Sequence, residues 1–205
     1  MSEIKIQDFV IGTEYQPFII AEAGLNHNGD LDKAIEMIHV AKQSGVNAIK
    51  FQTFKAHEIV EDPNLTYSYK SQGKEITESM LEMFKRCEFE REEWFKIKKE
   101  CDNSDILFLS TPQNKTDLDL LLEVGIPAIK VGSDDFTSLP LLKSFASTKL
   151  PLILSCGMSN LGEVYKALES IKALDGYPTV LLLTTSQYPT PIEEVNLQKI
   201  ITLSN

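Results

Sequence analysis

Two lysines, Lys50 and Lys130, each stand in the middle of a short apolar segment, 47–54 and 127–133. In a β-strand successive side chains point to opposite faces, so each lysine would point away from its apolar neighbours. Burying an ammonium group costs several kcal/mol unless an anion accompanies it. Two such lysines, with serine and threonine hydroxyls in the same segments, predict a site for a phosphate or a carboxylate. The alternative, which the residues alone leave open, is that each lysine reaches solvent or pairs with a core carboxylate such as Glu22.

Other polar residues stand near the C-terminal ends of the apolar segments. They are Glu22, Gln52, Thr111, Ser133, Ser155, Ser186 and Tyr188. In a parallel sheet these ends meet at one edge, which is where α/β barrels place their active sites. Glu22 fits either a catalytic carboxylate or the buried partner of an ion pair. Ser155 is expected to act as a hydrogen-bond donor, because no GxSxG nucleophile motif surrounds it.

His27 lies between Gly24 and Gly29, in a segment that reads as a loop before a helix start at Asp30. A single histidine on a loop is more often an exposed or capping residue than a ligand. We therefore expect His27 to be exposed or to cap the helix.

Six apolar segments alternate with segments of helical periodicity, about 20–30 residues apart. Strands are expected at 17–24, 47–54, 106–112, 127–133, 151–157 and 179–186. Helices are expected near 30–44, 77–101, 115–124, 138–147, 160–174 and 192–203. Strands that are apolar on both faces are typical of a parallel sheet covered by helices, either open or closed into a barrel. No GxGxxG or GxxxxGKS/T pattern follows a strand, so nothing supports a dinucleotide or P-loop site.

The segment 55–76 follows the second expected strand and lacks a clear periodicity. It contains Pro, Gly, Asn and two Tyr residues. Long connections in compact domains are usually lids or binding loops. An irregular binding loop is therefore expected here.

The composition excludes several classes of protein. The 205 residues carry 20 basic and 30 acidic side chains, a formal net charge of −10, which argues against nucleic-acid and anionic-membrane partners. No apolar stretch approaches the roughly 20 residues that cross a bilayer, and the N-terminus lacks the order of a secretory signal. The three cysteines lack the spacing of a zinc site. We expect a soluble cytoplasmic protein with reduced thiols.

Longer motifs connect the candidate residues. In chain order they are PFIIAEAGLNHNGDLDKA, NAIKFQTFKA, FLSTPQN, IKVGSDDFTSLPLL, LILSCGMSN and TTSQYPTPIEEVNL. With these motifs, nearly the whole chain resembles the sialic acid synthases, also called N-acetylneuraminate or nonulosonate synthases. The resemblance implies an α/β fold of the (β/α)₈ TIM-barrel type, followed by a small antifreeze-like domain. About six βα units are present, so residues 1–205 are expected to form an incomplete barrel without the antifreeze-like domain.

The resemblance also implies a reaction. Members of this family condense phosphoenolpyruvate with an N-acetylmannosamine-type sugar and release phosphate, with Mn²⁺ or Mg²⁺ bound. The GYSDHT-type segment that supplies a metal-ligating histidine follows the sixth unit and has no counterpart up to Asn205. The resemblance therefore implies a metal cofactor but no metal ligands within this chain.

Roles for individual residues follow from the same resemblance. Glu22 would be the catalytic carboxylate, and Asp135, which stands where some members carry Glu, would take part in proton transfer. The residues implied to bind the substrates are Lys50, Gln52, Thr111, Lys130, Ser133, Ser155, Ser186 and Tyr188. We expect the ammonium groups of Lys50 and Lys130 to point into one cavity and to share one anion.

Two alternatives stay open. One is a catalytically inactive barrel that binds anions or oligomerises. The other is a different phosphoenolpyruvate-dependent synthase of sugar acids, against which the AEAGLNHNGD motif argues. The sequence does not distinguish N-acetylmannosamine from a diacetamido analogue as the acceptor. Unpaired first and sixth strands would favour association into a homo-oligomer such as a dimer.

Overall fold

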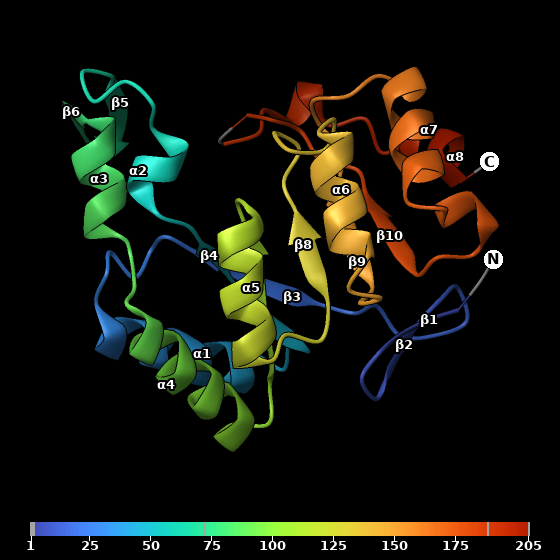
Figure 1. Cartoon of the computed structure of the whole chain (residues 1–205), viewed down its shortest axis with the longest axis horizontal. Coiled ribbons are helices and arrows are strands. Elements are labelled where there is room, and N and C mark those ends of the chain that lie inside the picture. The colour runs from blue at the N-terminus through green and yellow to red at the C-terminus, as the bar shows by residue number, and fades with distance from the viewer. Residues whose placement is uncertain (1–2, 72, 188, 205) are drawn as a thin grey trace. The chain divides into compact units, whose positions relative to one another are not determined.

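The computed structural model describes residues 3–71, 73–187 and 189–204 (Figure 1). The chain forms two compact units, one made of residues Ile19–Gly125 and the other of Ile126–Asn205 together with the N-terminal residues through Phe18. Both contain parallel strands connected by helices. Within the described ranges, no helix is long and apolar enough to cross a membrane.

The unit Ile19–Gly125 is built on three parallel strands. In spatial order they are β3 (Ile20–Gly24), β4 (Ala48–Thr53) and β7 (Leu107–Pro112). The main helices are α1 (Leu31–Gln43), α4 (Arg91–Asn103) and α5 (Lys115–Val124). Helices α1 and α4 pack side by side (Figure 1). The rings of Phe51 and Phe108 pack against Trp94 of α4, with centroids about 6.2 Å apart, and form the core of this unit.

The helix boundaries of this unit follow from capping side chains. Asp30 accepts the N–H of Lys33 at the start of α1, and Asn114 accepts the N–H of Asp117 at the start of α5. Gly125 ends α5 in the left-handed conformation, with φ of 94°. These are the residue types that favour helix ends, and α5 spans the 115–124 range predicted from the sequence.

The prediction of an irregular loop over 55–76 was wrong. This part of the chain contains α2 (Ala56–Ile59) and an antiparallel hairpin of β5 (Thr66–Ser71) and β6 (Lys74–Ser79). The hydroxyls of Ser68 and Thr77 lie 2.7 Å apart across the hairpin. The ring of Tyr67 stacks on Tyr69, whose hydroxyl donates to Glu78.

The single helix expected near 77–101 is divided into α3 (Met80–Arg86) and α4. Between them the carboxylate of Glu88 turns inward, where it accepts the N–H of Ala56 at 2.6 Å and the ammonium of Lys55 at 3.2 Å. A capping box between Glu90 and Glu93 then starts α4. The helix is interrupted here because the carboxylate of Glu88 accepts the backbone N–H of Ala56 at the start of α2.

The second unit also has three parallel strands. In spatial order they are β8 (Ile129–Val131), β9 (Leu152–Ser155) and β10 (Thr179–Leu182). Its helices are α6 (Leu139–Ala146), α7 (Leu161–Ser170) and α8 (Lys199–Ser204), with 3₁₀ turns η1 (Ala173–Asp175) and η2 (Ile192–Glu194). The helix expected near 192–203 is thus a 3₁₀ turn followed by a short helix. A hairpin of β1 (Ile4–Ile6) and β2 (Phe9–Ile11), which the sequence did not predict, also belongs to this unit.

Candidate active site

Glu22 and Lys50 form an ion pair at the boundary between β3 and β4. The two residues are partners in the parallel register, which becomes irregular between Glu22 and Gly24. The side chain of Lys50 is 9% exposed and that of Glu22 is 51% exposed. The half-exposed carboxylate of Glu22 thus neutralises the buried lysine, and the binding of a substrate anion by Lys50 stays a prediction.

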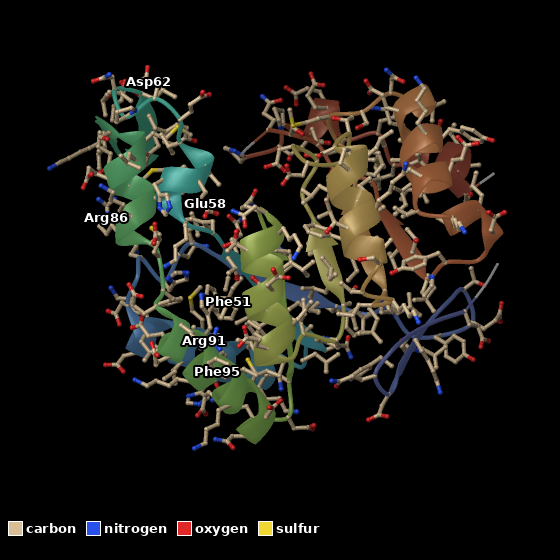
Figure 2. All side chains as sticks on the ribbon, viewed as in Figure 1. Phe51, Glu58, Asp62, Arg86, Arg91 and Phe95 are labelled. Atoms are coloured by element: carbon tan, nitrogen blue, oxygen red, sulfur yellow. The ribbon has the colours of Figure 1, made fainter. Side chains whose placement is uncertain are left out.

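The alternation predicted for β4 is present. Ile49 and Phe51 are buried, and Phe51 lies toward α4 (Figure 2). Gln52 lies beside Thr111 of β7 in the register. A Cβ on Gly24 would lie 3.4 Å from Glu22 Oε1 and 3.9 Å from Gln52 Nε2. The carboxylate of Glu22 and the amide of Gln52 therefore both lie close to the backbone of Gly24.

Lys130 and Ser155 meet in the second unit. The ammonium of Lys130 donates to Ser155 Oγ at 2.8 Å and to the carbonyl of Val131 at 2.6 Å, and both side chains are buried. Ser155 was expected to donate a hydrogen bond, whereas in this contact its Oγ accepts one from Lys130. Because Lys50 and Lys130 belong to different units, their sharing of one anion stays a prediction.

Ser133 and Ser186 also come together, with their Oγ atoms 3.4 Å apart. Burial raises the pKa of the Asp135 carboxyl, and the charge of Asp134 raises it further. A carboxyl that holds its proton more firmly suits proton transfer near neutral pH. Tyr188 lies outside the described residues.

Two buried hydroxyls were not among the predicted site residues. Ser159 Oγ and Thr184 Oγ1 have no hydrogen-bond partner within the described part of the chain. A Cβ on Gly157 would lie 2.6 Å from Thr184 Oγ1 and 2.8 Å from the Thr184 carbonyl oxygen. The loop after β9 therefore packs so closely on the end of β10 that it requires glycine at this position.

The expectation that His27 is exposed or caps the helix was wrong. Its side chain is fully buried and stacks on Phe89, with ring centroids 4.3 Å apart. Nδ1 accepts the N–H of Gly29 at 3.0 Å, so the neutral ring carries its proton on Nε2. Burial lowers the pKa of His27 to about 4, although the negative charge of Asp30 acts to raise it. His27 is therefore a neutral core residue of the loop that follows Glu22.

Asp117 is a buried carboxyl that the sequence analysis did not identify. It lies in the first turn of α5, where the helical pattern predicts a solvated face, yet only 4% of it is exposed. Burial raises its pKa to about 7. The N-cap residue Asn114 donates to Glu58 of α2 (Figure 2). No signal in the local sequence distinguishes Asp117 from the exposed Asp119.

No group of three or more His, Cys, Asp or Glu side chains that would hold a metal ion occurs among the described residues. The cysteines Cys87, Cys101 and Cys156 are free thiols and are buried.

Parallel strands with lysines, hydroxyls and carboxylates near their C-terminal ends are typical of α/β enzymes that act on small anionic substrates. Residues 37–205 match the NeuB family, and the chain belongs to it. The resemblance to the sialic acid synthases is thereby confirmed.

Individual relatives support this assignment. The chain is 38% identical over 198 residues to the N,N'-diacetyllegionaminic acid synthase of Legionella pneumophila, covering 95% of this chain and 56% of that protein. It is 31% identical over 194 residues to the N-acetylneuraminate-9-phosphate synthase of Homo sapiens, covering 93% and 52%. The N-acetylneuraminic acid synthetase of Leptospira borgpetersenii, solved in complex with citrate, superimposes with a TM-score of 0.88 at 33% identity, over 98% of this chain and 66% of that one. The chain spans just over half the length of the curated relatives it matches.

Proposed function

We propose that this chain is the phosphoenolpyruvate-binding part of a nonulosonate synthase, which condenses phosphoenolpyruvate with an N-acetylmannosamine-type sugar and releases phosphate. The observation that carries the proposal is a buried lysine in each unit. Lys50 lies beside the carboxylate of Glu22, and Lys130 donates to the hydroxyl of Ser155. Membership of the NeuB family supports the reaction class. The acceptor sugar and a cytoplasmic location belong to the same proposal.

The residues suit the chemistry of phosphoenolpyruvate. Its phosphate and carboxylate require cations and donors, which Lys50, Lys130 and the hydroxyls of Thr111 and Ser155 would supply. In the reaction C3 of phosphoenolpyruvate forms a bond to the aldehyde carbon of the sugar, and positive charge develops at C2. Water then adds to C2, and the C2–O bond to phosphate breaks. Glu22 carries the negative charge that would stabilise the cationic centre and orient this water.

Asp135 is the second carboxyl of the proposal. Burial and the charge of Asp134 raise its pKa, which favours its protonated form and suits proton transfer to the sugar oxygen. Since the described residues do not form a metal-binding group, we derive no step through Mn²⁺ or Mg²⁺.

Binding of phosphoenolpyruvate to the 205-residue chain tests the proposal. Isothermal titration calorimetry with Lys50→Met and Lys130→Met should each show affinity weakened by about 10- to 100-fold, the value of a charge-assisted hydrogen bond. Lys166→Met removes an exposed lysine of α7 and should leave the affinity unchanged, which controls for net charge.

Wild-type chain that does not bind phosphoenolpyruvate, or binding that both substitutions leave unchanged, would refute the proposal. Mass spectrometry of mixtures containing phosphoenolpyruvate and each candidate sugar identifies the acceptor wherever product forms. A product from N-acetylmannosamine or its diacetamido analogue supports a nonulosonate synthase, and a heptulosonate or octulosonate product identifies another synthase class.

A further inference from the structure

The ends of β4 and β7 are held together by more than strand pairing. The hydroxyls of Thr53 and Ser110 lie 2.7 Å apart and are buried. Beyond them, the N–H of Gln113 donates to the carbonyl of Thr53 at 3.2 Å. These contacts fix the turn that follows Thr111 against the strand that carries Lys50 and Gln52.

Asp117 lies beneath this turn. Its Oδ2 accepts the same N–H of Gln113 at 3.3 Å, so this donor is shared between Thr53 and Asp117. The backbone N–H of Asp117 donates to Asn114 Oδ1 at 2.9 Å. The amide nitrogen of Asn114 in turn donates to Glu58 of α2. The carboxyl of Asp117 is thus bonded to the turn after β7, and its backbone N–H is bonded to Asn114, whose amide reaches the helix that follows β4.

The charges that face Asp117 come from α2 and its N-cap. Burial raises the pKa of Asp117 to about 7, the hydrogen bond from Gln113 lowers it, and the charge of Glu58 raises it. Lys55 lowers it, but the ammonium of Lys55 is also paired with Glu88. Ionised Asp117 would therefore face the carboxylate of Glu58 across Asn114.

The charged residues of α5 itself leave this balance unchanged. Lys115 and Asp119 form an exposed ion pair with each other, 2.7 Å apart, one turn along the helix surface. Exposed pairs interact weakly with their surroundings because water screens them. The electrostatic environment of Asp117 is therefore set mainly by α2.

We propose that Asp117 is a positioning residue of the phosphoenolpyruvate site, whose carboxyl holds the turn after Thr111 in place through its hydrogen bond with Gln113. The inference rests on the proposed function, because it concerns the same substrate. Thr111 lies beside Gln52 in the register, so movement of the turn would displace both side chains from the substrate. Repulsion between ionised Asp117 and Glu58 would loosen this arrangement as the pH rises.

Two substitutions separate the hydrogen bond from the charge. Asp117→Asn keeps an oxygen acceptor for the N–H of Gln113 and cannot ionise. Asp117→Leu is larger and apolar, and has no acceptor. Asp119→Asn changes an exposed carboxylate of the same helix and serves as the control for net charge.

The dissociation constant of phosphoenolpyruvate is measured by calorimetry from pH 6 to 8.5. Each value for a variant is divided by the wild-type value at the same pH, so that effects of substrate ionisation on binding cancel. We expect Asp117→Asn to match wild type at pH 6 and to bind about 5-fold more tightly at pH 8.5, the equivalent of one modest hydrogen bond. Asp117→Leu should bind about 5-fold more weakly at pH 6. Asp119→Asn should give a ratio near one throughout.

A ratio for Asp117→Asn that does not change with pH would overturn the inference, even if Asp117→Leu fails to fold. Loss of binding in Lys50→Met together with unchanged binding in every Asp117 variant would refute the positioning role alone. Absence of binding in the wild-type chain would instead refute the proposed function, and the inference with it.

Discussion

Acid should destabilise the unit Ile19–Gly125 through His27. The folded protein holds this side chain neutral, with Nδ1 accepting from Gly29 and the ring stacked on Phe89. The pKa of His27 is lowered from 6.5 to about 4 by burial. The unfolded chain therefore binds a proton more readily than the folded chain between these values. Stability contributed by the neutral ring is complete above pH 6.5 and is lost as the pH falls toward 4.

The size of this loss follows from the two pKa values. Each pKa unit corresponds to about 1.4 kcal/mol, so the full effect below pH 4 is roughly 3 kcal/mol. At pH 5 the folded ring is still mostly neutral while the unfolded ring is mostly charged, and the loss is about 2 kcal/mol. This is a large fraction of the stability of an ordinary domain.

Urea unfolding at pH 7 and pH 5, followed by fluorescence, measures the effect. Trp94 is the single tryptophan of the chain and packs edge-on against Phe89 at 5.3 Å, so its emission reports on this unit. His27→Phe keeps an aromatic ring on Phe89, His27→Gln keeps a polar group, and neither titrates. Both should be less stable than wild type at pH 7, and the deficit should shrink by about 2 kcal/mol at pH 5. All other titrating groups cancel in this difference.

His57→Gln provides the matched control, because the side chain of His57 is 71% exposed. Its stability relative to wild type should not change between the two pH values. A deficit of the His27 variants that is the same at pH 7 and pH 5 would refute the reasoning, since it would mean that folded His27 titrates at its ordinary pKa.

Two further predictions concern catalysis and assembly. In a polypeptide that forms product, Glu22→Gln should lower kcat by about 10²–10³-fold with little change in the KM for phosphoenolpyruvate, because it removes a charge that acts in the transition state. An unchanged kcat would mean that Glu22 is only the ion-pair partner of Lys50. The chain should also associate at micromolar concentration, because β3 and β10 each have one strand neighbour within their unit and Leu197, Ile200 and Ile201 are more than half exposed. Light scattering that gives the mass of one chain at all concentrations would contradict this.

The alternation of strands and helices was predictable because buried segments have simple periodicities. Each of the six expected strands is present, although each is shorter than its apolar segment. Helix α5 was predicted to the residue, since Asn114 and Gly125 are strong start and stop signals. Where capping chemistry and periodicity agreed, the boundaries followed from local sequence.

The hairpin within 55–76 was missed for a physical reason. Its strands carry no continuous apolar stripe, because the hairpin is held by a hydroxyl pair, two stacked tyrosines and the ion pair of Arg86 with Glu78. The hydroxyl pair of Ser68 and Thr77 joins residues on different strands, and Arg86 belongs to α3, so the sequence of either strand alone does not predict these contacts. The division of the long helix was missed similarly, since it depends on the contact of Glu88 with the start of α2.

The candidate site shows the same limit at the level of single side chains. Of the residues expected at the site, Lys130 lies with Ser155 and Ser133 with Ser186. Lys50, Thr111, Lys130 and Ser155 are buried, whereas Glu22 is half exposed and Ser186 is exposed. The sequence did not predict Asp117, because its burial depends on the turn at Gln113 and on α2. Side chains that are buried by loops rather than by strands leave no periodic signal.

The position of Glu22 depends on the register of β3 against β4 more than on the amino-acid sequence of either strand. A slip of one residue would place an alanine beside Lys50 and turn the carboxylate to the opposite face. The register shifts between Glu22 and Gly24, and Gly24, which pairs with Phe51 of β4, has a φ of 52°. His27 then closes the loop by accepting the N–H of Gly29, whose missing Cβ leaves room for the carbonyl of Arg86. The glycines and the buried histidine of AEAGLNHNGD therefore fix the register that keeps the carboxylate beside the lysine.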